Sequence, residues 1–220
     1  HGSEEGLAAY DRAIAIRPKH VPALFGRALA RQDRGDLDGA IGDFTEALKI
    51  NPRSAAAFCD RGIARQCKGD LDAAIEDATE ALKLNPRLAV ALRIRGRARF
   101  DKADHDGAIH DCTEALKIGP RDAVAFDLRG AARFAKGNHD GAIQDCAEAL
   151  KINPRLVSAL ANRGIARKEK GDLDGAIDDF TEALSVNPRH AEAFQGRGGA
   201  REAKGDLDGA IYDYTQALTI

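Results

Sequence analysis

Apolar residues recur every three or four positions along this chain, in paired stretches that return every 34 residues. One stretch brings Ala57, Phe58 and Ala64 to a single side of a helix, and the next does the same for Ala74 and Leu82. Such spacing predicts two amphipathic helices in each repeat. Because the small alanines allow close approach, each repeat is expected to fold as a helix hairpin.

Glycine, proline and acidic residues mark the expected ends of these helices. The first helix of a repeat runs into a basic residue and a glycine, as at Lys68 and Gly69, which is typical of a helix C-terminus. Acidic residues follow at once, as at Asp70, where they favour the start of the next helix. The second helix is expected to end at an Asn-Pro-Arg sequence, as at Asn85, because proline cannot continue it.

Six repeats are visible, and they begin at Val21, Ala55, Ala89, Ala123, Val157 and Ala191. The last one stops at Ile220, four residues short of a full period. Residues 4–20 are expected to form a second helix alone, and residues 1–3 are interpreted as an expression scar that replaces the true N-terminus. Stacked hairpins share a continuous core, so the sequence predicts one all-α domain, an α-solenoid of antiparallel helix hairpins.

The repeat resembles that of the tetratricopeptide repeat family, which pairs an aromatic residue and glycine in the first helix with alanines and a final proline around the second. Phe58, Gly62, Ala74, Ala81 and Pro86 match this pattern, and the resemblance covers nearly the whole chain. Where the family usually has leucine and tyrosine in the first helix, every repeat here has arginine. The resemblance implies a superhelical, non-catalytic protein-interaction scaffold whose first helices line a concave peptide-binding groove.

Two rows of arginine occupy the first helices. The rows are Arg27, Arg61, Arg95, Arg129, Arg163, Arg197 and Arg31, Arg65, Arg99, Arg133, Arg167, Arg201. Arginine near a core is unfavourable without an anionic partner, and the second helices supply Asp43, Asp77, Asp111, Asp145, Asp179 and Asp213. We expect this pairing in every repeat, with a row of glutamates that includes Glu46 as further acceptors. The alternative, a phosphate track for RNA, is weaker because each basic row has an acidic row of equal period.

The first-helix surface opposite the packing stripe, here called the variable face, differs from repeat to repeat. Its expected partner-contacting residues are Phe25, Leu29, Cys59, Asp60, Ile63, Arg93, Ile94, Arg97, Phe100, Asp127, Leu128, Phe134, Asn162, Ile165 and Lys168. The resemblance implies that they hold a peptide or helix of a partner protein. Independently, an exposed apolar strip usually marks an interaction site, although single residues of the set could instead pack against a neighbouring first helix.

Charge and composition exclude several other classes of function. The net charge is -2, so the molecule offers no electrostatic footprint for nucleic acid or an anionic membrane, and no apolar run is long enough for a membrane span. Neither partner is therefore expected. No nucleophile triad or phosphate-binding loop stands out, which predicts a protein that is not an enzyme and has no cofactor.

Cysteine and histidine give weak signals. The four cysteines lack the spacing of a zinc site or of a disulfide, so they are interpreted as free thiols in a reducing, cytoplasmic compartment. His105 and His110 form a pair that could bind a metal, but they are more simply partly exposed substitutions, and no metal site is expected.

The ends of the array suggest a second function. Both outermost helices are second helices, and neither is followed or preceded by a polar capping helix of the kind that keeps solenoids soluble. Head-to-tail contact through such ends would build a homo-oligomer. The uncapped ends indicate either a fragment of a longer array or ends that bind another molecule, and self-assembly through them is the alternative to partner binding.

Overall fold

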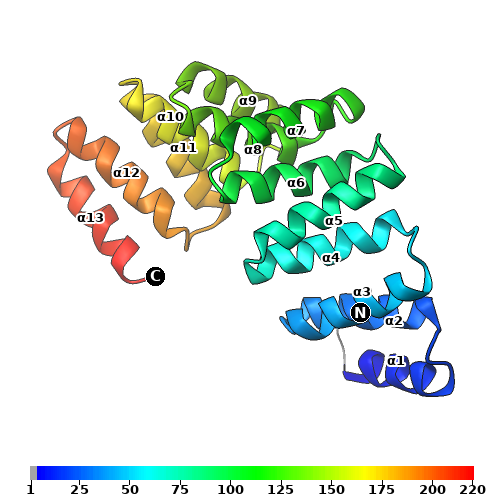
Figure 1. Ribbon diagram of the computed structural model, residues 1–220. Coiled ribbons are helices and arrows are strands. Elements are labelled where there is room, and N and C mark those ends of the chain that lie inside the picture. Colours follow the sequence, from blue (N-terminus) through cyan, green and yellow to red (C-terminus); the bar gives the residue numbers. More distant parts are fainter. Residues whose placement is uncertain (1–3) are drawn as a thin grey trace. The chain divides into compact units, whose positions relative to one another are not determined.

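The computed structural model describes residues 4–220, which form thirteen helices joined by short turns (Figure 1). The expected expression scar, residues 1–3, lies outside the described residues. The first helices of the repeats are α2 (Val21–Asp33), α4 (Ala55–Lys68), α6 (Ala89–Asp101), α8 (Ala123–Ala135), α10 (Val157–Glu169) and α12 (Ala191–Ala203). The second helices are α3 (Leu37–Ile50), α5 (Leu71–Leu84), α7 (His105–Ile118), α9 (His139–Ile152), α11 (Leu173–Val186) and α13 (Leu207–Leu218). Before them comes α1 (Glu4–Ile16), which has the pattern of a second helix.

The chain divides into two compact units, an N-terminal unit that ends at Gly107 and a C-terminal unit that begins at Ala108. In the N-terminal unit α2 packs against α3 and α1, and α4 against α5 and α3. In the C-terminal unit α10 packs against α11 and α9, and α12 against α13 and α11. First helices also contact the first helix of the next repeat, as in the pairs α4 with α6 and α10 with α12. The predicted all-α architecture of stacked helix hairpins is confirmed in both units.

Local side-chain chemistry sets the helix ends as the sequence predicts. The Asp36 carboxylate accepts a hydrogen bond of 2.9 Å from the backbone N–H of Gly39 and so caps the start of α3. At the end of α4, Gly69 takes φ of 88°, which residues other than glycine rarely adopt. Ala103 occupies the matching place after α6 with φ of 63°, and it is the only residue other than glycine with a positive φ in the described chain.

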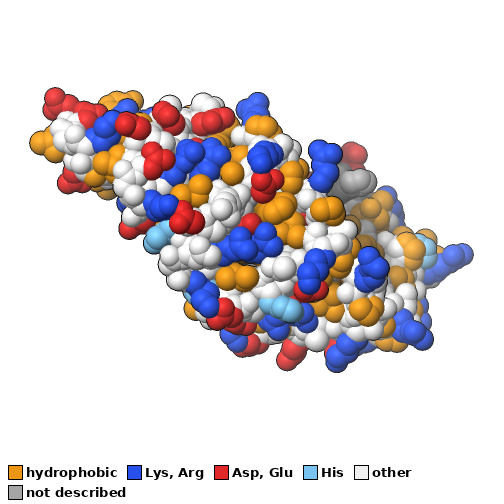
Figure 2. Space-filling model, turned by 90° about the horizontal axis from the view of Figure 1, so that it is seen from above, with side chains coloured by type: hydrophobic (Ala, Val, Ile, Leu, Met, Phe, Trp, Pro, Cys, Tyr) orange, Lys and Arg blue, Asp and Glu red, His pale blue; other side chains and the backbone are white. Residues whose placement is uncertain are grey.

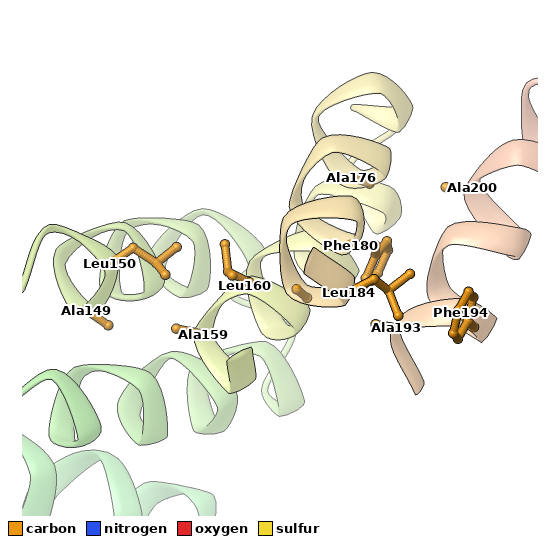
Figure 3. Close-up of a cluster of buried hydrophobic side chains, with 11 residues drawn as sticks. Ala149, Leu150, Ala159, Leu160, Ala176, Phe180, Leu184, Ala193, Phe194 and Ala200 are labelled. Carbon is orange, nitrogen blue, oxygen red and sulfur yellow. The ribbon is translucent and has the colours of Figure 1, made fainter. Parts of the chain in front are cut away.

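Alanine makes up most of the core, and a few large side chains fill the space between repeats. In the C-terminal unit one buried cluster runs from α9 to α12. Figure 3 shows Phe180 and Leu184 of α11 directed toward α12, where Phe194 and Ala200 lie. Since small residues let the helix axes approach, the repeats stack closely without many large apolar side chains.

The arginine rows are paired as predicted in five of the six repeats. In the last repeat, Nε and Nη2 of Arg197 donate to the two oxygens of Asp213 at 2.9 and 2.7 Å. Arg201 Nη1 donates to the same carboxylate at 2.8 Å, and Asp213 is fully buried. In the remaining set, Arg95 and Arg99 belong to the N-terminal unit and Asp111 to the C-terminal unit.

In four repeats the first arginine, Arg27, Arg61, Arg129 or Arg197, also joins its repeat to the one before. Nη1 of Arg197 donates to Oγ1 of Thr181 at 3.1 Å, and Arg61 donates to Thr45 at 3.0 Å in the same way. Arg27 uses Asp11 of α1 at this place, at 2.7 Å. One guanidinium group therefore holds three helices in register.

The glutamate row does not act as the further acceptor for these arginines. In four repeats the glutamates pair with lysines three residues later, namely Glu46 with Lys49, Glu80 with Lys83, Glu114 with Lys117 and Glu148 with Lys151. Residues three apart lie side by side on a helix surface, so this exposed partner is nearer than the arginines across the hairpin. The expected acceptor role was therefore wrong for these four residues, and threonine takes it instead.

Successive repeats contact each other through one large and one small side chain. The second-helix positions Tyr10, Phe44, Ala78, Cys112, Cys146 and Phe180 lie in register with the first-helix positions Gly26, Asp60, Ile94, Leu128, Asn162 and Gly196. A Cβ atom on Gly196 would lie 2.4 Å from Cζ of Phe180, whereas Ile94 shares a buried cluster with Ala78. Glycine thus accompanies an aromatic ring, and a bulky aliphatic residue accompanies a small one.

Replacing Asp179 with alanine should lower the free energy of unfolding by about 2–4 kcal/mol, because Arg163 and Arg167 lose their shared counter-charge. The matched control is Asp178→Ala, on the exposed side of the same helix, which should change it by less than about 0.5 kcal/mol. Urea unfolding followed by circular dichroism measures both. Equal losses in the two variants would contradict a structural role for the pairing.

Replacing Gly196 with valine should lower the free energy of unfolding by about 1–3 kcal/mol, because the new side chain meets the Phe180 ring. Adding Phe180→Ala removes the ring, and Ala78 with Ile94 shows that the reversed sizes pack. A double-mutant cycle should therefore give a favourable coupling energy of about 1 kcal/mol or more. Additive losses in the double variant would show that the two positions are independent.

Candidate partner-binding face

The expected partner-contacting residues all lie on first helices, and they fall on both units. Those in the N-terminal unit belong to α2, α4 and α6, and those in the C-terminal unit belong to α8 and α10. Their differences in burial divide them into two groups, one between the repeats and one open to solvent. Figure 2 shows that basic, acidic and hydrophobic side chains are interspersed on the visible face of the molecule.

Four of the expected partner-contacting residues are buried, namely Cys59, Ile94, Asp127 and Leu128. Ile94 and Leu128 expose only 4% and 5% of their surface, and Cys59 is equally buried. Ile94 and Leu128 fill the space opposite Ala78 and Cys112, because small side chains leave room there. The expected exposure was wrong because a helix wheel takes account of one hairpin and not of the repeat stacked against it.

The open part of the variable face in the N-terminal unit is apolar with a cation at its edge. Leu29 on α2 exposes 38% of its surface, and Ile63 on α4 is half-buried. Arg97 on α6 is exposed, and its Nε donates to Asp101 at 3.1 Å. Gln66 of α4 donates to the other oxygen of Asp101 at 3.1 Å, which links α4 to α6 at the surface. Phe25, also half-buried, places its ring edge against Phe44 with centroids 5.2 Å apart.

In the C-terminal unit, a buried carboxylate forms part of the same face. Asp127 on α8 accepts hydrogen bonds of 2.6 Å from Ser158 and 2.8 Å from Asn162, both on α10. These contacts join two neighbouring first helices, so Asp127 and Asn162 satisfy each other rather than remain open for a ligand. Ile165 and Lys168 continue along α10 as half-buried residues that reach the surface.

Two aromatic residues of the face rest on histidines of the next helix. The rings of Phe134 and His139 have centroids 5.1 Å apart, and those of Phe100 and His105 lie 5.4 Å apart. The sequence analysis missed this pairing, although it carried a signal. The repeats with phenylalanine at this place are the two in which histidine replaces the usual leucine at the start of the second helix. The histidines are therefore packing partners of the phenylalanines.

Asp60 stands apart from the other acidic residues of the face. It is half-buried on α4, and among the described residues no group donates a hydrogen bond to it or forms an ion pair with it. Burial raises the pKa of this carboxyl group above its usual value. The neighbouring cation does not compensate it, because Arg61 is already bound to Asp77 and Thr45.

The cysteines are all free, as predicted. Burial raises the pKa of the Cys59 thiol to about 11 and that of Cys112 to about 12, so both are protonated and act as small apolar side chains. Within residues 4–220, no three histidine, cysteine or acidic side chains are grouped in a way that would hold a metal ion. No helix in this part of the chain has the length and apolar character needed to cross a bilayer.

Comparison with protein families finds a match that covers most of the chain. The sequence matches the tetratricopeptide repeat family over residues 2–55, 59–123 and 162–220. None of the curated proteins matches it significantly.

Several solved structures have a similar fold. MamA is 27% identical with a TM-score of 0.63, over 72% of this chain and 92% of MamA. The APC/C heterotetramer Cut9–Hcn1 contains a chain that is 17% identical with a TM-score of 0.89, over 99% of this chain but 44% of that one. YrrB, described as having an unusual peptide-binding site, is 22% identical with a TM-score of 0.62, over 80% of this chain and 91% of YrrB. Because the family match covers more than half of the sequence, this chain belongs to the tetratricopeptide repeat family.

Proposed function

We propose that this protein is a non-catalytic scaffold that binds a peptide or helix of a partner protein on its variable face. Tetratricopeptide repeats are protein-interaction scaffolds. The observation that carries the proposal is the partly exposed apolar surface on the first helices of each unit. It consists of Leu29, Ile63 and Phe100 in the N-terminal unit and, separately, of Phe134 and Ile165 in the C-terminal unit. These residues differ between repeats at places where the hairpin does not dictate the side chain.

The same structure argues against the arginine rows as a nucleic-acid surface. Five pairs of arginines are each held by a buried aspartate, and in four of them the first member also bonds the preceding repeat. Guanidinium groups engaged in this way are not available to phosphates. At the edge of this face, Arg97 pairs with Asp101 and Lys168 with Glu169, so these two cations are also engaged with carboxylates.

Substitution of Leu29 by aspartate should abolish partner binding without unfolding the protein, because this side chain is on the surface. The test is selection of a displayed library of random short peptides on the full chain, followed by fluorescence anisotropy with a selected peptide. Leu29→Asp should weaken binding about tenfold or more.

Leu84→Asp is the matched control for this test. Leu84 is exposed to 36%, nearly the same as Leu29, but lies at the end of the second helix α5. The control should bind within about twofold of the original chain. Equal binding by the Leu29 variant, or no enriched peptide at all, would refute the proposal.

A second candidate function is self-association through α13. Leu207, Ile211 and Leu218 form an apolar row along this helix, and Leu218 is exposed to 88%. The matching residue of α11, Leu184, is exposed to only 7% because α12 packs over it. An uncovered row of this kind favours association with another apolar surface.

Light scattering across protein concentration tests this second function. The apparent mass should rise with concentration for the original chain and for Leu84→Asp, whereas Ile211→Asp should remain monomeric. A constant monomer mass for the original chain, or association that persists in Ile211→Asp, would rule out assembly through this row.

A further inference from the structure

Asp60 is a half-buried carboxylate of a first helix to which no described residue donates a hydrogen bond or pairs as a cation. Asp77 and Asp213 are each bound by two arginines. Asp127, at the neighbouring place on the first helix of a later repeat, accepts two hydrogen bonds. A half-buried carboxylate without a donor is unfavourable for folding, so Asp60 is not explained by the packing of its own repeat.

Asp60 lies on the variable face of α4. Asp60 occupies the register position of Gly26 and Ile94, which is next to the second helix of the preceding repeat. Ile63 follows three residues later and so lies on the same side of α4. Leu29 is at the place of Ile63 in the preceding repeat, and both are open to solvent at least in part.

Among the described residues, no cation forms an ion pair with Asp60, and Arg61 and Arg97 have other partners. Arg61 directs its Nε and Nη2 to Asp77 at 3.0 and 2.6 Å, and its Nη1 to Thr45 at 3.0 Å. Arg97, the exposed cation of the same face, is bound to Asp101. The position therefore combines a negative charge with partial burial, and Ile63 lies on the same side of the helix.

We infer that Asp60 is the subsite for a basic residue of the bound peptide. This rests on the proposed function, and it names the chemistry of the partner segment at one position. The ammonium or guanidinium group of a lysine or arginine pairs with the Asp60 carboxylate, while the aliphatic stem of that residue lies on Ile63. The pKa of Asp60 is raised by burial, as is expected for a carboxylate without a counter-ion in the unbound protein.

Peptides selected from the random library provide the test of this pairing. Peptides that depend on Leu29 should contain a lysine or arginine, and Asp60→Asn should weaken their binding about tenfold or more. Replacing the basic residue of the peptide by norleucine should produce the same loss in the original chain and no further loss in Asp60→Asn. Glu76→Gln, which removes one negative charge from the exposed side of α5, is the control and should bind within about twofold.

The outcomes distinguish the Asp60 subsite from the proposed scaffold function. Leu29-dependent peptides without a basic residue, or unchanged affinity in Asp60→Asn, would overturn the subsite and leave the scaffold function standing. Failure to find any Leu29-dependent peptide would overturn both. Retention of the Asp60 effect with the norleucine peptide would show that the aspartate does not act through the charge.

Thermal unfolding of the unbound protein gives an independent measurement. A carboxyl group whose pKa is raised on folding opposes folding above that pKa, so Asp60→Asn should raise the midpoint of thermal unfolding at pH 7. The gain should disappear as the pH falls far enough to protonate Asp60, and Glu76→Gln should show no such gain. A lower midpoint for Asp60→Asn would mean that the carboxylate has a stabilising partner inside the fold, which would overturn the inference.

Discussion

The shared ion pair between two arginines and one aspartate is the interaction on which the rest of this structure depends. A core made largely of alanine buries little apolar surface per helix, and alanine by itself does not specify how helices are oriented. The guanidinium group of Arg197 supplies that specificity, because its donors reach Asp213 within the hairpin and Thr181 in the preceding repeat. A buried ion pair often contributes little net stability, but breaking it is costly, and it therefore defines the register of helices.

This arrangement also decides which residues are left for recognition. Positions such as Gly196 and Ile94 are coupled by size to the helix of the preceding repeat, so they vary between repeats without being exposed. Leu29, Ile63 and Arg97 occupy a place that lacks this constraint and reaches solvent. Residues thus vary between repeats at two kinds of position, buried positions that are coupled by size and exposed positions. Only the exposed positions are expected to contact a partner. Asp60 belongs to the coupled position but is polar and uncompensated, which is why it points to a ligand.

Membership of the tetratricopeptide repeat family explains the scaffold and leaves the chemistry of the face to this chain. The similar structures share between 17% and 27% of its residues over the aligned parts, which is enough for the hairpins and their stacking. The arginine rows are a departure from the usual family pattern, and their pairing with buried aspartates engages these guanidinium groups inside the hairpins. The partner-binding residues must therefore be read from this sequence, repeat by repeat.

The sequence by itself determined the helices, their ends and the arginine–aspartate pairing, because each depends on residues that are close in the chain or repeat with the same period. Capping at Asp36 and the turn at Gly69 are local events of this kind. Only the tertiary structure decided that Ile94 and Leu128 are buried, that threonine rather than glutamate completes the arginine contacts, and that Phe134 rests on His139. The exposure of a first-helix side chain depends on the size of the residue that it faces on the second helix of the preceding repeat. The periodicity of one helix carries no information about that residue.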